Sequence, residues 1–312
     1  MFWFIFLFII FIRICFEIFW RFNRKKFIFD TQKENTWCII TGAGNGLGLE
    51  YAKLFAEKGY NLLLLSLCKN ELLNAKNIIL KQLNSKKLKT IQIEILEVDF
   101  SKTETCYEEI ETFLEPYLND ISVLLNNVGT DGQHCDYYEL GNSQQKNRLM
   151  INVNLYSVTK MIELILPHMK LNHRGLIISI SSGAAITASP FIATYASTKA
   201  YIRTLMQALA VENQHSGVTF VTFCPYWIST NLTNNAPTNY FMPDAETYAK
   251  HSLAKIQSTK SFETIGYFRH QVLYVLTKSI GWIGGIELEH SYLHWFMIKI
   301  QKFRKTLIVK NK

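Results

Sequence analysis

Six short apolar runs alternate with longer amphipathic segments along this chain, and the alternation limits the fold more than any other feature. Runs such as NLLLLSL (61–67) are apolar at consecutive positions, which is typical of strands in parallel sheets covered by helices on both faces. Helical periodicity between the runs, as in 49–60 and 161–170, completes the pattern of a doubly wound α/β fold. We therefore expect strands at 37–41, 61–67, 91–100, 121–129, 175–182 and 218–225.

The length of 312 residues suits one domain of about 250 residues with an extension at each end. No internal repeat or low-complexity linker interrupts the chain. We expect a hydrophobic membrane anchor with a basic flank at 1–26, a single α/β domain at 35–275, and an aromatic and basic tail at 276–312.

The first twenty residues, MFWFIFLFIIFIRICFEIFW, are apolar except for Arg13 and Glu17. The run lacks the basic start and the small-residue cleavage site of a secretory peptide, and it is long enough to enter a bilayer. Four basic residues follow within positions 21–26. Basic residues beside a membrane segment usually face the cytoplasm, so we expect this end of the anchor on the cytoplasmic side. A buried core helix is the alternative, but aromatic residues on every face favour the anchor.

The net charge of +8 suits a nucleic acid, an anionic membrane surface or a polyanionic ligand. Basic residues gather at the two ends of the chain, so we expect membrane lipid as a partner and no nucleic acid. The tail resembles an amphipathic segment on an anionic leaflet, although a solvated basic terminus is also open. The six cysteines include no Cys-x-x-Cys pair, so we expect neither a metal site nor a disulfide framework.

The first expected strand runs directly into TGAGNGLG (41–48) and then into a helix. Glycine lets the backbone approach a phosphate, and a helix N-terminus supplies free N–H donors. Gly42, Gly46 and Gly48 at this first strand-to-helix turn therefore predict a dinucleotide site in a Rossmann-type sheet.

The adenosine end of such a site lies near the tip of the second strand, where an acid suits NAD and a base suits NADP. The residues there, Ser66 to Lys69, include no acid, so Lys69 favours NADP(H), with NAD(H) not excluded. Asp99, at the end of the third strand, is expected to bind the adenine amino group or simply to cap the strand.

Tyr195 and Lys199 are four residues apart and would share one helix face. A nearby ammonium stabilises a tyrosinate, so the tyrosine could deliver a proton to a carbonyl oxygen. Ser182, at the tip of the fifth expected strand, faces the ligand crevice of such folds and could bind that carbonyl. Asn154 could hold a water beside Lys199, or could be an ordinary structural hydrogen-bonding residue.

These motifs, with NNVG (126–129) and Pro225, occur in the order and spacing of the short-chain dehydrogenases/reductases, which the chain resembles from residue 36 to 235. The resemblance implies that Tyr195 is the catalytic acid and that Lys199 lowers its pKa and orients the nicotinamide ribose. It implies that Ser182 polarises the carbonyl and Asn154 carries the proton relay. Further cofactor contacts are implied for Leu47, Asn126, Asn127, Pro225, Ile228 and Thr230.

Within that family, INVNLYSVTKMIELILPHM (151–169) and IGYFRHQ (265–271) resemble the branch of 17β-hydroxysteroid dehydrogenases types 3 and 12 and very-long-chain 3-oxoacyl-CoA reductases. This likeness implies an endoplasmic reticulum membrane enzyme with its catalytic domain in the cytoplasm. Branch members usually carry an arginine where this chain has Leu67, which leaves the phosphate contact to Lys69.

The resemblance implies an NADP(H)-dependent reductase of a lipid carbonyl, with a long-chain 3-oxoacyl-CoA as the leading substrate. The loop after Pro225 carries Tyr226, Trp227, Tyr240 and Phe241, and it would cover an acyl chain or a steroid. Hydroxysteroid oxidation or reduction is the alternative activity. A catalytically silent nucleotide-binding scaffold is the alternative of another class, and a homodimer is left open.

Overall fold

The computed structural model describes residues 36–132, 144–187, 189–256 and 262–278, together with 291, 292, 294, 295, 298 and 299. The anchor expected at 1–26 and the basic end of the tail lie outside these residues, so both stay predictions.

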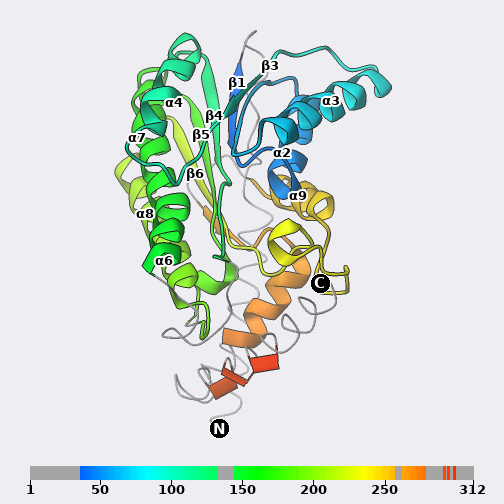
Figure 1. The fold of residues 1–312 in the computed structure, drawn as a ribbon, viewed down its shortest axis with the longest axis vertical. Helices are drawn as coiled ribbons and strands as arrows, with labels where there is room; N and C mark the ends of the chain where they lie inside the picture. The colour runs from blue at the N-terminus through cyan, green and yellow to red at the C-terminus, as the bar shows by residue number, and fades with distance from the viewer. Residues whose placement is uncertain are drawn as a thin grey trace.

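Seven parallel strands form one sheet in the order β3-β2-β1-β4-β5-β6-β7, which confirms the α/β fold (Figure 1). The order reverses beside β1, so the carboxyl ends of β1 and β4 flank the crevice where ligands bind in such sheets. The strands are β1 Trp37–Thr41, β2 Asn61–Ser66, β3 Ile93–Glu97, β4 Ile121–Asn126, β5 Gly175–Ile180, β6 Val218–Phe223 and β7 Phe262–Thr264.

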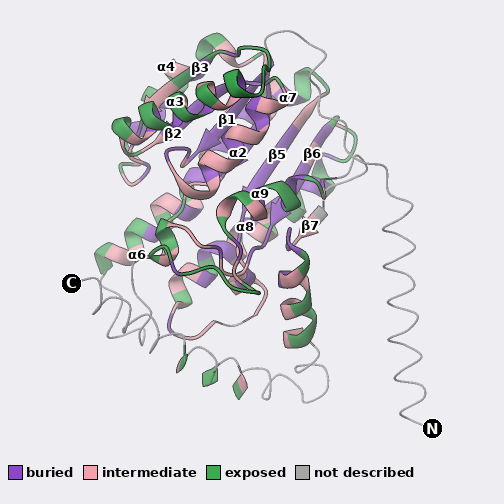
Figure 2. Ribbon diagram, turned by 90° about the vertical axis from the view of Figure 1, so that its right-hand side faces the viewer, coloured by how far each residue is buried: buried purple, intermediate pink, exposed green. Residues whose placement is uncertain are grey.

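Helices cover both faces of the sheet, so successive strand residues are buried in opposite cores. In β1, Cys38 and Ile40 pack against the α2, α3 and α9 side, whereas Trp37 and Ile39 pack against the α4, α7 and α8 side. Figure 2 shows the strands buried between these layers. The helices are α2 Gly46–Glu57, α3 Lys69–Ser85, α4 Cys106–Leu114, α6 Gln144–Met150, α7 Ser157–Leu171, α8 Ala193–Glu212 and α9 Ala245–Leu253.

Short helical pieces complete the architecture. A π-helical segment, Ile151–Tyr156, joins α6 to α7, so residues 144–171 form one continuous helix. It is the helix in the described part of the chain that is long and apolar enough to cross a membrane, but Met161 and Ile165 are fully buried against the sheet. Three-residue 3₁₀ helices lie at Glu115–Tyr117, Gly183–Ala185 and Asn231–Thr233, and residues 268–278 are also helical.

All six expected strands are present, and most end earlier than the apolar runs predicted. β3 covers only 93–97 of the expected 91–100, because it is an edge strand whose Glu94 and Glu97 are exposed. The seventh strand was not expected, since β7 has only three residues and no apolar run marks it. The helix at 268–278 continues through the boundary expected between 275 and 276.

Candidate active site

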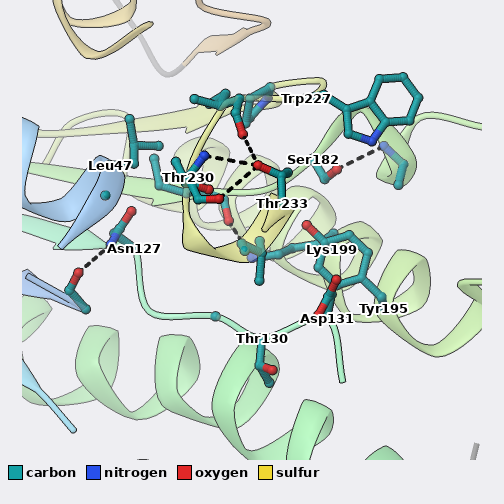
Figure 3. Close-up of a pocket in the computed structure, with 18 of the residues that line it drawn as sticks. Leu47, Asn127, Thr130, Asp131, Ser182, Tyr195, Lys199, Trp227, Thr230 and Thr233 are labelled. Atoms are coloured by element: carbon teal, nitrogen blue, oxygen red, sulfur yellow. Dashed lines mark hydrogen bonds between the residues drawn. The ribbon is translucent and has the colours of Figure 1, made fainter. Parts of the chain in front are cut away.

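A cavity of about 740 Å³ runs along the carboxyl ends of β1, β4 and β5. Figure 3 shows Leu47 and Asn127 toward one end of it and Tyr195 with Lys199 toward the other. The cavity therefore connects the glycine-rich turn with the tyrosine and lysine of α8.

The glycine-rich turn is built so that its backbone faces the cavity. Gly46 has a left-handed φ of +53° and lines the cavity, so a side chain there would strain the turn. Gly48 lies behind the turn, where an added Cβ would come within 2.1 Å of the carbonyl oxygen of Gly42. Gly46 thus leaves the backbone of the turn open to the cavity, and Gly48 allows α2 to pack closely on the turn.

Asn127 holds the glycine-rich turn against the end of β4. Its Nδ2 donates to the carbonyl oxygens of Thr41 at 3.0 Å and Gly42 at 3.1 Å. The Thr41 hydroxyl accepts from the backbone N–H groups of Asn127 and Val128, each at 3.0 Å. This role of Thr41 was not expected from the sequence, although the residue stands at the end of β1, where it begins the glycine-rich turn.

Lys199 lies on the same face of α8 as Tyr195, as the spacing predicted. Its Nζ donates to the carbonyl oxygen of Ile180 at 2.9 Å and lies 5.8 Å from the centre of the Tyr195 ring. The lysine is only 4% exposed, and this burial lowers the pKa of its ammonium to about 8. The site therefore holds a buried cation whose charge is easily lost.

Ser182 follows β5 and caps the 3₁₀ helix Gly183–Ala185. Its Oγ accepts a hydrogen bond from the backbone N–H of Ala184 at 3.1 Å, so the hydroxyl proton is directed elsewhere. Tyr226 packs on Gly183 so closely that a Cβ there would meet its ring at 2.9 Å. The serine is thus placed to donate into the cavity that it lines.

Asn154 is fully buried in the π-helical segment, a kind of distortion that often marks functional sites. Its Oδ1 accepts from the N–H of Thr130 at 2.7 Å, and its Nδ2 donates to the Thr130 carbonyl at 2.7 Å and to Thr198 Oγ1 at 3.2 Å. These bonds hold the segment that follows β4. They show a structural role directly, and the proton relay stays a prediction.

Gly129 leaves a small space between Asn154 and Lys199. A Cβ on this glycine would lie 3.2 Å from Lys199 Nζ and 3.4 Å from Asn154 Oδ1. A side chain at 129 would therefore crowd both Lys199 and Asn154.

The expected cofactor residues divide into two groups. Asn126 is buried inside the sheet, where it donates to Ser179 Oγ at 3.3 Å, and Lys69 is exposed and bonded through its backbone N–H to Glu97. Neither lines the cavity, and neither does Gly48, which lies behind the turn, so the cofactor contacts expected of these three residues stay predictions. Those that do line it are Gly42, Gly46, Leu47, Asp99, Asn127, Tyr195, Lys199, Pro225, Ile228 and Thr230.

Only two of the four aromatic residues that we expected to cover the cavity, all in the loop after β6, line it. Tyr226 and Trp227 line it, whereas Tyr240 and Phe241 are exposed and do not. His270 links both parts of the loop: its Nδ1 accepts from the N–H of Tyr226 at 3.3 Å, and its Nε2 lies 2.9 Å from the carbonyl oxygen of Phe241.

Several residues that line the cavity were not expected from the sequence. Leu273 and Thr277, one turn apart on the helix 268–278, close the cavity from the C-terminal side, and Tyr292 also lines it. Glu71, in the first turn of α3, reaches the cavity beside the glycine turn. No local motif marks these positions.

Among the described residues, no three His, Cys, Asp or Glu side chains gather closely enough to hold a metal ion. The chemistry that the described site offers is proton donation and charge stabilisation by Ser182, Tyr195 and Lys199.

Comparisons with known proteins agree with this geometry. A family model described as short chain dehydrogenase matches residues 36–240. The 17-beta-hydroxysteroid dehydrogenase type 3 of Rattus norvegicus is 32% identical over 244 residues, 78% of this chain and 76% of that protein. The very-long-chain 3-oxoacyl-CoA reductase of Anas platyrhynchos is 27% identical over 277 residues, 88% of this chain and 83% of that protein.

Two solved structures share the fold. One is an alcohol dehydrogenase from the archaeon Thermococcus sibiricus complexed with 5-hydroxy-NADP, at TM-score 0.62 and 21% identity, over 74% of this chain and 96% of that chain. The other is a 3-ketoacyl-(acyl-carrier-protein) reductase from Brucella melitensis complexed with NADH, at TM-score 0.60 and 22% identity, over 74% of this chain and 97% of that chain.

Proposed function

Because the chain belongs to the short chain dehydrogenase family, we propose that it uses a nicotinamide dinucleotide to reduce a lipid carbonyl, with a long-chain 3-oxoacyl-CoA as substrate. The observation that carries the proposal is the single cavity with the glycine turn at one end and Ser182, Tyr195 and Lys199 at the other. The family and the relatives named as dehydrogenases and reductases make the chain an oxidoreductase.

The residues present fit a dinucleotide. The backbone of Gly42 and Gly46 lines the cavity at the N-terminus of α2, where N–H groups and the helix dipole favour a pyrophosphate. Leu47 and Ile228 give an apolar surface beside it, and Thr230 lines the same stretch. Structures with this fold hold 5-hydroxy-NADP or NADH, which supports a nicotinamide group at this place.

A nicotinamide dinucleotide supplies the hydride when it is bound. The chain's own side chains supply the proton: the carbonyl carbon gains the hydride, and its oxygen gains the proton of Tyr195 to give an alcohol. Ser182, whose Oγ already accepts from Ala184, donates its hydroxyl to that oxygen and holds it toward Tyr195. The Lys199 ammonium stabilises the tyrosinate that is left.

Apolar side chains around the rest of the cavity support a lipid substrate. Trp227 covers it from the loop after β6, and Leu273 closes it from the helix 268–278. The relatives include a 3-oxoacyl-CoA reductase at 27% identity and a hydroxysteroid dehydrogenase at 32% identity, and both names are consistent with a lipid carbonyl. A net charge of +8 also suits the phosphates of coenzyme A.

The proposal includes attachment to the endoplasmic reticulum membrane through residues 1–26, with the catalytic domain in the cytoplasm. It is supported by the apolar run and by the basic residues that follow it. The earlier expectation of NADP(H) has no support from Lys69, which does not line the cavity.

The test is nucleotide oxidation by the full chain in detergent, with NADH and NADPH each offered with a long-chain 3-oxoacyl-CoA or a 17-ketosteroid. Turnover of the acyl-CoA, lost in Tyr195→Phe while nucleotide binding remains, is the expected result. Turnover of the steroid alone would replace the acyl substrate with the hydroxysteroid alternative. Bound nucleotide without turnover of either substrate would favour the silent scaffold.

A further inference from the structure

A carboxylate lies against the glycine turn at the adenosine end of the cavity. Oε2 of Glu71, in the first turn of α3, accepts a hydrogen bond from Nδ2 of Asn45 at 2.8 Å. Both residues line the cavity, as does Ser66 at the end of β2. The contact therefore fixes an acidic group where the second strand, the glycine turn and α3 meet.

Gly44 permits this arrangement by having no side chain. A Cβ built there would lie 2.9 Å from Cβ of Glu71, 3.0 Å from its Oε2 and 3.3 Å from Ser66 Oγ. The glutamate thus packs directly on the backbone of the turn. Its position is set by this packing and by the bond to Asn45, whereas an exposed surface carboxylate would be free to turn away.

The charges around the cavity are unequal at its two ends. Among the described residues that line it, the acidic ones are Glu71, Asp99 and Asp131, and the basic one is Lys199. Lys199 lies at the far end, bonded to the carbonyl of Ile180. The described lining therefore offers no cation beside the glycine turn.

Two basic residues near the ends of β2 and β3 also supply no cation to the lining beside the glycine turn. Lys69 is exposed, and its backbone N–H is bonded to the carboxylate of Glu97 at 3.2 Å. Lys102 has a side chain that is 72% exposed and lies 4.0 Å from Asp99, whose charge it offsets. Neither residue lines the cavity.

Building on the proposed function, we propose that Glu71 selects NAD(H) over NADP(H). In a Rossmann-type sheet the adenosine ribose lies near the tip of the second strand, and an acid there binds its 2′-hydroxyl. The strand end offers Leu67 instead, and Glu71 supplies the missing carboxylate from α3. Within the described part of the chain, its Oε1 accepts no hydrogen bond, so that oxygen is available to the ribose hydroxyl.

A 2′-phosphate at the same place would bring a dianion against a fixed carboxylate with no cation from the described lining. Like charges at short range in a partly buried site repel each other, and we expect this repulsion to set a preference of about tenfold or more. A preference for NAD(H) is the opposite of the preference for NADP(H) that Lys69 indicated in the sequence.

The test measures equilibrium binding of NADH and NADPH to the full chain in detergent by nucleotide fluorescence. We expect the wild-type protein to bind NADH at least about tenfold more tightly, and Glu71→Gln to bring the two affinities close together. Glu71→Arg should favour NADPH. The matched control is Glu109→Gln, which removes an exposed carboxylate from the first turn of α4 and should leave the ratio unchanged.

Tighter binding of NADPH by the wild-type protein, or an unchanged ratio in Glu71→Gln, would overturn this inference and leave the proposed function intact. Binding of neither nucleotide would overturn the proposed function and the inference together. Selective binding of NADH without turnover of any lipid carbonyl would support the role of Glu71 and contradict only the proposed reaction.

Discussion

The ammonium of Lys199, on helix α8, donates a hydrogen bond of 2.9 Å to the carbonyl oxygen of Ile180, the last residue of β5. The bond joins the helix that carries Tyr195 to the strand that leads into Ser182. It therefore helps to hold Tyr195, the proposed proton donor, near Ser182, the residue proposed to bind the carbonyl.

The buried ammonium gives the reaction an alkaline limit. Burial lowers the pKa of Lys199 to about 8, so the cation that stabilises the tyrosinate is lost as the pH rises through that value. We expect kcat/KM for carbonyl reduction to fall above a pH of about 8. Lys199→Arg, which keeps its charge, should have lower activity without this limit. A flat wild-type profile to pH 10, measured with steady-state kinetics, would contradict the assignment.

Gly129→Ala should impair proton supply without removing any catalytic side chain. The new methyl would lie 3.2 Å from Lys199 Nζ and 3.4 Å from Asn154 Oδ1, in the space that a relay water would occupy. We expect kcat to fall about tenfold or more, since a tenfold loss needs only about 1.4 kcal/mol of extra activation free energy. Nucleotide affinity, measured by fluorescence, should change little. Unchanged kcat in a folded variant would remove the relay from this position.

His270 should make the protein less stable in weak acid. Burial lowers its pKa to about 4, below the ordinary value of 6.5, so the unfolded chain takes up a proton that the folded one does not. Its stabilising contribution is complete above pH 6.5 and is lost as the pH falls toward 4, by up to about 3 kcal/mol. Urea unfolding between these pH values measures the loss.

Two variants separate His270 from the other titrating groups. His270→Gln can still hydrogen-bond to the 226 and 241 backbone but cannot titrate, so its stability should depend less on pH in this range. His215→Gln removes an exposed histidine and should keep the wild-type dependence. Equal pH dependence in all three proteins would show that His270 is not responsible.

Leu273→Trp should narrow the substrate end of the cavity. Leu273 lines the cavity from the helix 268–278, whereas Val275 on the same helix is 51% exposed. We expect KM for the lipid substrate to rise roughly tenfold with nucleotide affinity unchanged, and Val275→Trp to resemble the wild type. Equal KM values for both variants and the wild type would place the substrate elsewhere.

The fold could be predicted because strands buried on both faces appear in the sequence as consecutive apolar residues. Leu62 to Leu65 form such a run, and β2 contains all four residues. β7 could not be predicted in this way, because a strand of three residues at the edge of a sheet needs no apolar run. The pair Tyr195 and Lys199 was also readable, since positions i and i+4 share a helix face.

Contacts between distant segments could not be predicted in this way. Glu71 and Asn45 are 26 residues apart, and only the packing of α3 on the glycine turn brings them together. Lys69 was expected at this place instead. Two residues along a helix correspond to a rotation of roughly 200°, so Lys69 faces solvent while Glu71 faces the cavity.

Leu273 and Thr277 add the C-terminal wall to a cavity whose glycine turn is formed by residues 41–48. On the ribosome the N-terminal part of a domain emerges first. The glycine turn, Ser182 and Tyr195 therefore leave the ribosome before the helix that carries Leu273 and Thr277. The wall that encloses the cavity is among the last parts of the site to be synthesised.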